Sequence, residues 1–72
     1  MMKRHDALLG LMRERAITQK ALADSIGMGI TTLNRKLNGE SDFTTREIAL
    51  VCVSCGIEGV DIPRYFFDLK TN

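Results

Sequence analysis

The stretch TQKALADSIGMGITTLNRKLNG, residues 18–39, decides the fold of this chain. Its first half has the pattern of a short amphipathic helix, because Thr18 is a residue type that caps helices and apolar residues then recur at helical spacing. These apolar residues are Leu22, Ala23 and Ile26. Gly27 follows the last of them, where a helix that ends in a left-handed residue favours glycine. We therefore expect a helix that opens at Thr18 and stops at Gly27.

The second half of the stretch predicts another short helix, over about residues 30–37. Leu33 and Leu37 lie one turn apart and should anchor this helix to the core, and Asn38-Gly39 is a strong stop signal. The face opposite the leucines is polar and carries Thr31, Thr32, Asn34 and Arg35. Two short helices joined by a tight, glycine-containing turn have the geometry of a helix-turn-helix.

The residues before this stretch predict a first helix, from about Asp6 to Arg15. We expect Asp6 to be its N-cap, since aspartate is a preferred capping residue. One face at helical spacing is apolar, with Leu8, Leu11 and Met12. Gly10 in the middle of a helix costs about 1 kcal/mol relative to alanine. We therefore expect a packing reason for it, such as the close approach of another helix.

The residues after the stretch predict two further helices. Thr44 and Glu47 fit a capping box ahead of an apolar run that should stop at Gly56. The apolar face of this run contains Ile48, Val51, Cys52 and Cys55. Pro63 can open a short fifth helix at its first turn. The sequence thus predicts an all-α, compact five-helix domain that forms one unit over residues 1–72, with the last few residues disordered.

Length and composition fit a small globular domain. The 72 residues leave room for one domain only, and the apolar and charged fractions, 44% and 26%, are ordinary values. No apolar run approaches the roughly 18 residues that a membrane span requires. The N-terminal segment lacks the apolar core and the cleavage site of a signal peptide. We therefore expect a cytoplasmic protein with no membrane partner.

The net charge is only +1, but it is unevenly distributed. Residues 1–39 carry seven basic and three acidic side chains, a net +4, whereas residues 40–72 carry three basic and six acidic ones, a net −3. A chain polarised in this way can present one face to a polyanion and another to a protein partner. Chance scatter of a few charges explains the same numbers equally well.

The chemistry-bearing residues do not combine into an enzyme site. Cys52 and Cys55 have the spacing CxxC, but a structural zinc ion needs four ligands and the only histidine, His5, is distant in sequence. We interpret the cysteines as reduced, buried residues on a helix, and His5 as a solvated surface residue. No nucleophile–base pair or phosphate loop is evident. The prediction is a protein that is not an enzyme and uses no cofactor or metal.

Residues 19–39 resemble the helix-turn-helix of the repressors and Cro proteins of lambdoid phages. The shared features are a glutamine at the start, an alanine four residues later, the Gly27-Met28-Gly29 turn, and Asn38-Gly39 at the end. Over nearly its full length the chain is more similar to small Cro-like regulators of Gram-positive bacteria and their prophages. The segments that carry this similarity are Thr18-Gln19-Lys20, Leu22-Ala23, Ile26-Gly27-Met28, Thr31-Thr32-Leu33, Arg35-Lys36-Leu37-Asn38-Gly39, Phe43-Thr44, Asp61-Ile62-Pro63 and Tyr65-Phe66-Phe67. Gly29 and Ile30 depart from the family, which often has serine and a polar base-contacting residue there.

The resemblance implies a lambda-repressor-like transcription regulator whose helix over residues 30–37 enters the major groove of double-stranded operator DNA. Its outer face would contact bases through Ile30, Thr31, Thr32, Asn34 and Arg35. Arg35 is the main candidate, because arginine pairs with guanine O6 and N7. Phosphate contacts would come from Gln19, Lys20, Lys36 and Asn38. For each of these residues taken singly, a solvated helix face is the plain alternative.

One module of this size buries little DNA surface, so specificity usually needs two copies on two half-sites. The candidate dimer surfaces are the C-terminal segment with Ile62, Tyr65, Phe66 and Phe67 and, second, Leu9 and Leu11 on the first helix. Closure of the monomer core is an equally good explanation for the aromatic residues. The alternative function is a protein-binding modulator or antirepressor that acts on a partner repressor, which the near-neutral net charge and the apolar Leu9 and Leu11 favour. An antitoxin-type DNA binder would need a toxin-wrapping segment, and none is visible in the sequence.

Overall fold

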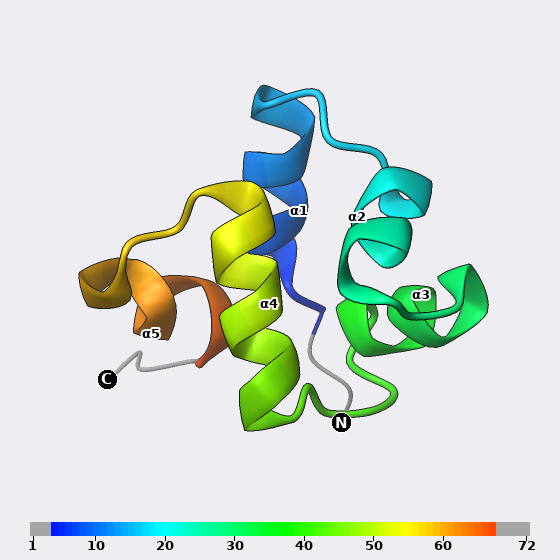
Figure 1. Ribbon diagram of the computed structural model, residues 1–72. Coiled ribbons are helices and arrows are strands. Elements are labelled where there is room, and N and C mark those ends of the chain that lie inside the picture. Colours follow the sequence, from blue (N-terminus) through cyan, green and yellow to red (C-terminus); the bar gives the residue numbers. More distant parts are fainter. Residues whose placement is uncertain (1–3, 68–72) are drawn as a thin grey trace.

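The computed structural model of the chain describes residues 4–67, and the regular structure in this range is all helical (Figure 1). In chain order the elements are α1 (Asp6–Glu14), α2 (Gln19–Ile26), α3 (Ile30–Leu37), α4 (Thr45–Cys55), the 3-10 turn η1 (Gly59–Asp61) and α5 (Ile62–Phe66). The predicted all-α class with five α-helices is confirmed, whereas η1 was not expected. The expected disorder of the last few residues lies outside the described range. None of the helices formed by residues 4–67 is long and apolar enough to cross a membrane.

The helix starts predicted at Thr18 and Thr44 are confirmed. The Thr18 hydroxyl accepts a hydrogen bond from the Ala21 N–H over 3.0 Å. At the start of α4 the Thr44 hydroxyl accepts from the Glu47 N–H over 3.1 Å, and a Glu47 carboxylate oxygen accepts from the Thr44 N–H over 2.9 Å. Each bond satisfies a backbone donor that has no partner inside its helix. These caps fix the residues at which α2 and α4 begin.

Four helices end with the same backbone arrangement. After each of α1 to α4 comes a residue with positive φ, and these residues are Ala16, Gly27, Gly39 and Gly56. The N–H of the following residue then donates to a carbonyl oxygen five positions back, as Met28 does to Ala23 over 2.9 Å. In three of the four cases that following residue is apolar and packs against the core, namely Ile17, Met28 and Ile57. Each of these three turns therefore ends a helix and adds a core contact.

The core is built from aliphatic side chains of the first four helices. The largest side chains with less than 2% exposure are Leu8, Leu22, Leu33, Leu37 and Val51. Burial of one such side chain stabilises the fold by about 1.5–3 kcal/mol. Because α1, α2, α3 and α4 each contribute at least one, the same contacts that stabilise the domain also fix the angles between its helices.

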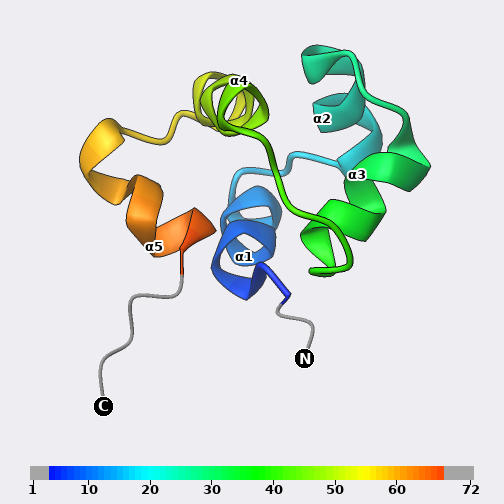
Figure 2. The same cartoon turned by 90° about the horizontal axis from the view of Figure 1, so that it is seen from below.

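The helices divide into two groups around α1 and α4. α2 and α3 lie together on one side of the molecule, and η1 with α5 lies on the opposite side (Figures 1 and 2). α2 packs against α4, and α5 packs against α1. The α2–α3 pair is therefore separated from the C-terminal aromatic residues by the two central helices.

Two expectations for α1 are wrong. Asp6 is the first helical residue rather than the N-cap; His5 holds the cap position, and no side chain caps the helix there. Apart from its chain neighbours and the backbone of α1, a Cβ built on Gly10 meets no atom of residues 4–67 within 4 Å, so no close approach of a neighbouring helix explains this glycine. The apolar stripe itself is confirmed, since Leu8, Leu11 and Met12 are buried.

His5 is half-buried, contrary to the expectation of a solvated residue. Its ring packs edge-on against Phe43 at 5.2 Å between centroids and lies 6.0 Å from Phe66. Phe43 and Phe66 are also in edge-to-face contact, at 5.4 Å. The His5 Nδ1 lies 3.3 Å from the Tyr65 carbonyl oxygen. These rings join the start of α1 to the loop before α4 and to α5, which anchors both ends of the domain.

Most side chains that were considered for a dimer surface pack inside the monomer. Phe66 and Leu11 are buried, at 8% and 6% exposure. Three others are half-buried against the core, namely Leu9, Ile62 and Tyr65. Phe67 remains exposed. Closure of the monomer core, the alternative kept open for the aromatic residues, is therefore what the structure shows for Phe66 and Tyr65.

Candidate nucleic-acid interface

The outer face of α3 is exposed and polar, as predicted. Leu33 and Leu37 have no exposed surface and hold the helix against the core from one side. The exposed side chains on the opposite face are Thr31, Thr32, Asn34 and Arg35. Ile30 begins the helix and is 47% exposed. A helix of eight residues is not stable alone, so the direction of this face depends on its two leucine anchors.

The turn between α2 and α3 is fixed by its backbone. Gly27 has a φ of +69°, the left-handed conformation predicted for it, which L side chains rarely adopt. The Met28 side chain packs against the core, as expected of a residue that fills the turn. Gly29 holds the N-cap position of α3 in extended conformation and has no side chain with which to cap it. The turn holds α2 and α3 together as one unit.

Three carboxamide side chains form a hydrogen-bonded chain on this unit. Asn38 Nδ2 donates to Asn34 Oδ1 over 3.1 Å, and Asn34 Nδ2 donates to Gln19 Oε1 over 3.1 Å. Asn34 is exposed, whereas Gln19 and Asn38 are half-buried. The helical i, i+4 spacing of Asn34 and Asn38 could have indicated the first bond. The second bond joins two helices and has no local signal in the sequence.

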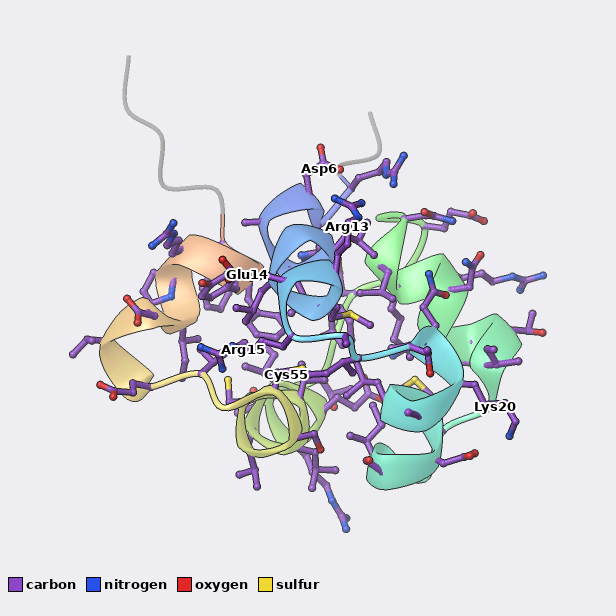
Figure 3. The ribbon with its side chains drawn as sticks, turned by 90° about the horizontal axis from the view of Figure 1, so that it is seen from above. Asp6, Arg13, Glu14, Arg15, Lys20 and Cys55 are labelled. Atoms are coloured by element: carbon purple, nitrogen blue, oxygen red, sulfur yellow. The ribbon has the colours of Figure 1, made fainter. Side chains whose placement is uncertain are left out.

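Lys20 points outward from α2 at the edge of the molecule (Figure 3). Its ammonium lies 3.1 Å from the Asp24 carboxylate, and the two side chains are 72% and 67% exposed. An ion pair this exposed contributes little to stability. It therefore opens at low cost when another anion approaches, and Lys20 keeps the freedom that a phosphate contact requires.

Lys36, which the sequence predicts to contact a phosphate, is buried and paired within the protein. The residue is 9% exposed, and its Nζ donates to a Glu47 carboxylate oxygen over 2.7 Å and to the Asp42 carbonyl oxygen over 3.0 Å. These bonds tie the end of α3 to the start of α4 and to the loop between them. Sequence reasoning missed this role because lysine is rarely buried unless it is paired, and its partner is eleven residues away.

The ionisation of Glu47 is coupled to this contact. The hydrogen bond from Lys36 lowers the pKa of the Glu47 carboxyl below its ordinary value of 4.5, and the bond from the Thr44 N–H lowers it further. Burial acts in the opposite direction and is outweighed. At neutral pH the ionised carboxylate both caps α4 and pairs with Lys36.

Cys52 and Cys55 are buried on α4, as predicted, at 7% and 2% exposure. Burial raises the pKa of both thiols above their ordinary value of 9.0. A protonated thiol is a poor nucleophile and a poor metal ligand. Both residues are core side chains, and they take no part in the candidate interface.

Two comparisons of the sequence with known proteins gave no match. A scan against protein-family models found no match, and a search of curated proteins found no significant match. The candidate interface is therefore defined by the geometry of α2 and α3 and by the chemistry of their exposed side chains.

Proposed function

We propose that this chain is a sequence-specific, DNA-binding transcription regulator of the lambda-repressor-like class, which inserts α3 into the major groove of operator DNA. The observation that carries the proposal is the outer face of α3, where exposed polar side chains lie opposite two leucines with no exposed surface. An α-helix fits the major groove of B-form DNA. A second helix presented across a tight turn is a common way to place one there.

The exposed side chains have the chemistry that this role needs. Arg35 is the main candidate for base recognition, because a guanidinium can donate two hydrogen bonds to one guanine. Thr31 and Thr32 can bond base edges, and Ile30 fits a contact with a thymine methyl group. Lys20, at the start of α2, fits a phosphate contact.

The charge distribution supports contact with a polyanion. Residues 1–39, which include the α2–α3 unit, hold the basic excess of the sequence. Lys36 contributes less to it than the sequence suggested, because Glu47 neutralises its ammonium. Lys20 and Arg35 are the exposed cations of α2 and α3. Electrostatic attraction to phosphates supplies most of the affinity in non-specific DNA binding.

The packing of α1 weakens one of the two observations that favoured a protein-binding modulator, the apolar residues of this helix. Leu11 is buried and Leu9 is half-buried against the core, so they do not form an exposed apolar patch. Val53 and Val60 are each 83% exposed. Single exposed apolar residues are ordinary on protein surfaces and do not define a partner site.

The test is selection of bound duplexes by the full-length chain from a randomised double-stranded DNA pool. Salt must be held fixed, because protein–DNA affinity falls steeply as salt rises. We expect enrichment of one sequence class, and the enriched duplex should bind more tightly than a scrambled duplex of the same composition. Equal binding of both duplexes would contradict sequence specificity, and failure to retain any duplex would contradict DNA binding.

A further inference from the structure

We infer that Asn38 is a site of spontaneous chemical modification, at which the side-chain amide is converted to a carboxylate whenever the last turn of α3 opens. The closed turn prevents the reaction, and DNA bound to α3 slows it further. The part that concerns DNA rests on the proposed function, whereas the chemistry at Asn38 does not.

The reaction follows from the Asn38-Gly39 pair, which occurs once in the sequence. Glycine has no side chain to hinder attack by its backbone nitrogen, so asparagine reacts fastest when glycine follows it. Hydroxide removes the Gly39 N–H proton, the nitrogen bonds to the Asn38 Cγ, and the Cγ–Nδ2 bond breaks with release of ammonia. Water then opens the cyclic imide at Cγ, which gives aspartate, or at the backbone carbonyl carbon, which gives isoaspartate. One water is consumed, one ammonia is released, and nothing is oxidised or reduced.

The folded chain holds this pair in a geometry that cannot cyclise. Asn38 has a ψ of −3°, which aligns the Gly39 nitrogen with the backbone nitrogen of Asn38 about the Cα–C bond. A five-membered imide ring requires the Gly39 nitrogen to be aligned with the Asn38 Cβ instead. The backbone must therefore rotate about this bond, out of its helical conformation, before the reaction can begin.

Two hydrogen bonds oppose this rotation, and they engage both reacting groups. The Gly39 N–H, which contains the attacking nitrogen, donates to the Lys36 carbonyl oxygen over 3.2 Å. The Asn38 Nδ2, which is the leaving group, donates to the Asn34 Oδ1 over 3.1 Å. The end of a helix opens at a smaller cost in free energy than the whole domain. Local opening of this turn, rather than unfolding of the domain, therefore sets the rate at Asn38.

Conversion changes the α2–α3 unit in two ways. An ionised carboxylate has no proton to donate, so the bond to Asn34 is lost and two acceptor oxygens face each other. The new negative charge also repels the phosphates of DNA. Isoaspartate adds one carbon to the main chain beside a turn in which the Glu40 N–H donates to the Arg35 carbonyl oxygen over 2.9 Å. The modified chain should thus bind DNA weakly, and DNA that stabilises the closed unit should slow the modification.

Peptide mapping by mass spectrometry tests the site on the full-length chain, kept at mildly alkaline pH with and without guanidinium chloride. The unfolded chain should convert Asn38 at least about tenfold faster than the folded chain. Asn34, which is followed by Arg35, is the internal control and should remain an amide in both samples over the same period. Equal conversion of Asn38 and Asn34 in the unfolded chain would overturn the site. Equal rates at Asn38 in the two samples would overturn its protection by the fold.

A variant of the hydrogen-bond partner tests whether local opening sets the rate. Asn34→Ala removes the acceptor of the Asn38 Nδ2, so conversion in the folded chain should accelerate by about threefold to tenfold. The thermal midpoint should stay nearly unchanged, because Asn34 is exposed. Thr31→Ala, at an exposed position of the same helix, is the control and should change the rate by less than about twofold. Equal rates in the two variants would overturn the role of the last turn.

The enriched duplex tests the coupling to DNA. In excess it should slow conversion of Asn38 by about tenfold, and a scrambled duplex at the same concentration by less than about threefold. Asn38→Asp, which reproduces one product, should lower affinity for both duplexes by about tenfold. Ala49→Glu makes the same charge change at an exposed position of α4 and should lower affinity by less than about threefold.

Unslowed conversion in the presence of the enriched duplex, or undiminished affinity of Asn38→Asp, would overturn this coupling. If the wild-type chain retains no duplex, the proposed function fails. The conversion rates of the free chain then still decide whether Asn38 is a modification site that the fold protects.

Discussion

Arg15, just after α1, donates a hydrogen bond from its guanidinium to the backbone carbonyl oxygen of Cys55, the last residue of α4 (Figure 3). The same Nη1 donates to the Gly56 carbonyl oxygen over 3.1 Å. Carbonyl groups at a helix C-terminus lack partners inside the helix and carry partial negative charge. A cation in this position satisfies them, and it joins two helices whose contacting residues are 40 positions apart.

Arg15→Ala should lower the free energy of unfolding by about 1–2 kcal/mol, because it removes a charged donor from the end of α4. Urea denaturation followed by circular dichroism measures this change. Arg13→Ala is the control, since Arg13 is an exposed arginine in the last turn of α1. It should change the unfolding free energy by less than about 0.5 kcal/mol. Equal losses in the two variants would show that the contact with α4 contributes nothing.

Gly56→Ala tests the same contact from the other side. A Cβ at this position would lie 2.8 Å from the Arg15 Nη1, and the φ of +73° strains any L side chain. The variant should therefore displace the guanidinium as well as strain the turn. Adding Arg15→Ala to Gly56→Ala should then cost less than Arg15→Ala costs alone.

The contact between Lys36 and Glu47 predicts a specific dependence of stability on pH. Glu47 has a lower pKa in the folded chain than in the unfolded one, so the unfolded state binds more protons as the pH falls. This contribution to stability is fully present above the unfolded pKa, near 4.5, and is lost as the pH falls through the folded pKa. Urea midpoints measured from neutral to acid pH should decline over this range.

Glu47→Gln should lower stability at pH 7 and make the acid decline shallower. Glu58→Gln, at an exposed position outside the network, is the control and should leave the decline unchanged. If the urea midpoint of Glu47→Gln falls with acidic pH as steeply as that of the wild type, Glu47 is not a cause of the decline.

The local parts of this structure could be predicted from the sequence, and the contacts between elements could not. Thr18, Gly27 and the Thr44–Glu47 capping box each act within a few residues, so their residue types suffice to place helix ends. The bonds from Lys36 to Glu47 and from Arg15 to Cys55 join residues that only the tertiary fold brings together. Both donors are long cations, and the sequence predicted a phosphate contact for Lys36 and no contact for Arg15.

The candidate site divides in the same way. The exposed face of α3 follows from helical periodicity and from the buried Leu33 and Leu37. The link from Asn34 to Gln19 depends on how α2 and α3 cross, which no single-helix pattern contains. Ala16 shows the reverse case: its left-handed conformation, at a φ of 56°, is imposed by the turn against the preference of the residue.

Replacing glycine by alanine at position 10 and alanine by glycine at position 16 are opposite substitutions, and both should stabilise the fold. Gly10 lies within α1 with open space beside it, so alanine should add about 0.5–1 kcal/mol through helix propensity. Ala16 holds the left-handed position that ends α1, where glycine removes strain of similar size. Thermal unfolding measures both changes. Ala7→Gly, at an exposed position of α1, is the control and should destabilise the fold by about 1 kcal/mol. A less stable Gly10→Ala would indicate a close contact at this position.

Arg35 and Lys20 should affect DNA binding in different ways. Arg35→Ala should cost about 1–3 kcal/mol of binding free energy on the enriched duplex and relax the base preference, because it removes a guanine contact. Lys20→Ala should weaken binding to all duplexes alike, because it removes a phosphate contact. It should also reduce the slope of log affinity against log salt concentration, the salt slope, by about one. Mobility shifts over a range of salt concentrations measure both effects. Equal affinity of the wild type and Arg35→Ala for the enriched duplex would remove Arg35 from base recognition.

Lys36 should behave differently from both, although it is adjacent to Arg35 in sequence. Lys36→Met keeps much of the buried aliphatic chain but leaves the Glu47 carboxylate without its ammonium, so it should lower the free energy of unfolding by about 1.5–3 kcal/mol. Its salt slope on DNA, measured at a temperature where the variant is folded, should match that of the wild type. The side chain of Lys36 is only 11% exposed, so its charge is already compensated inside the protein. A salt slope reduced as far as in Lys20→Ala would show that Lys36 leaves Glu47 to contact a phosphate when the duplex binds.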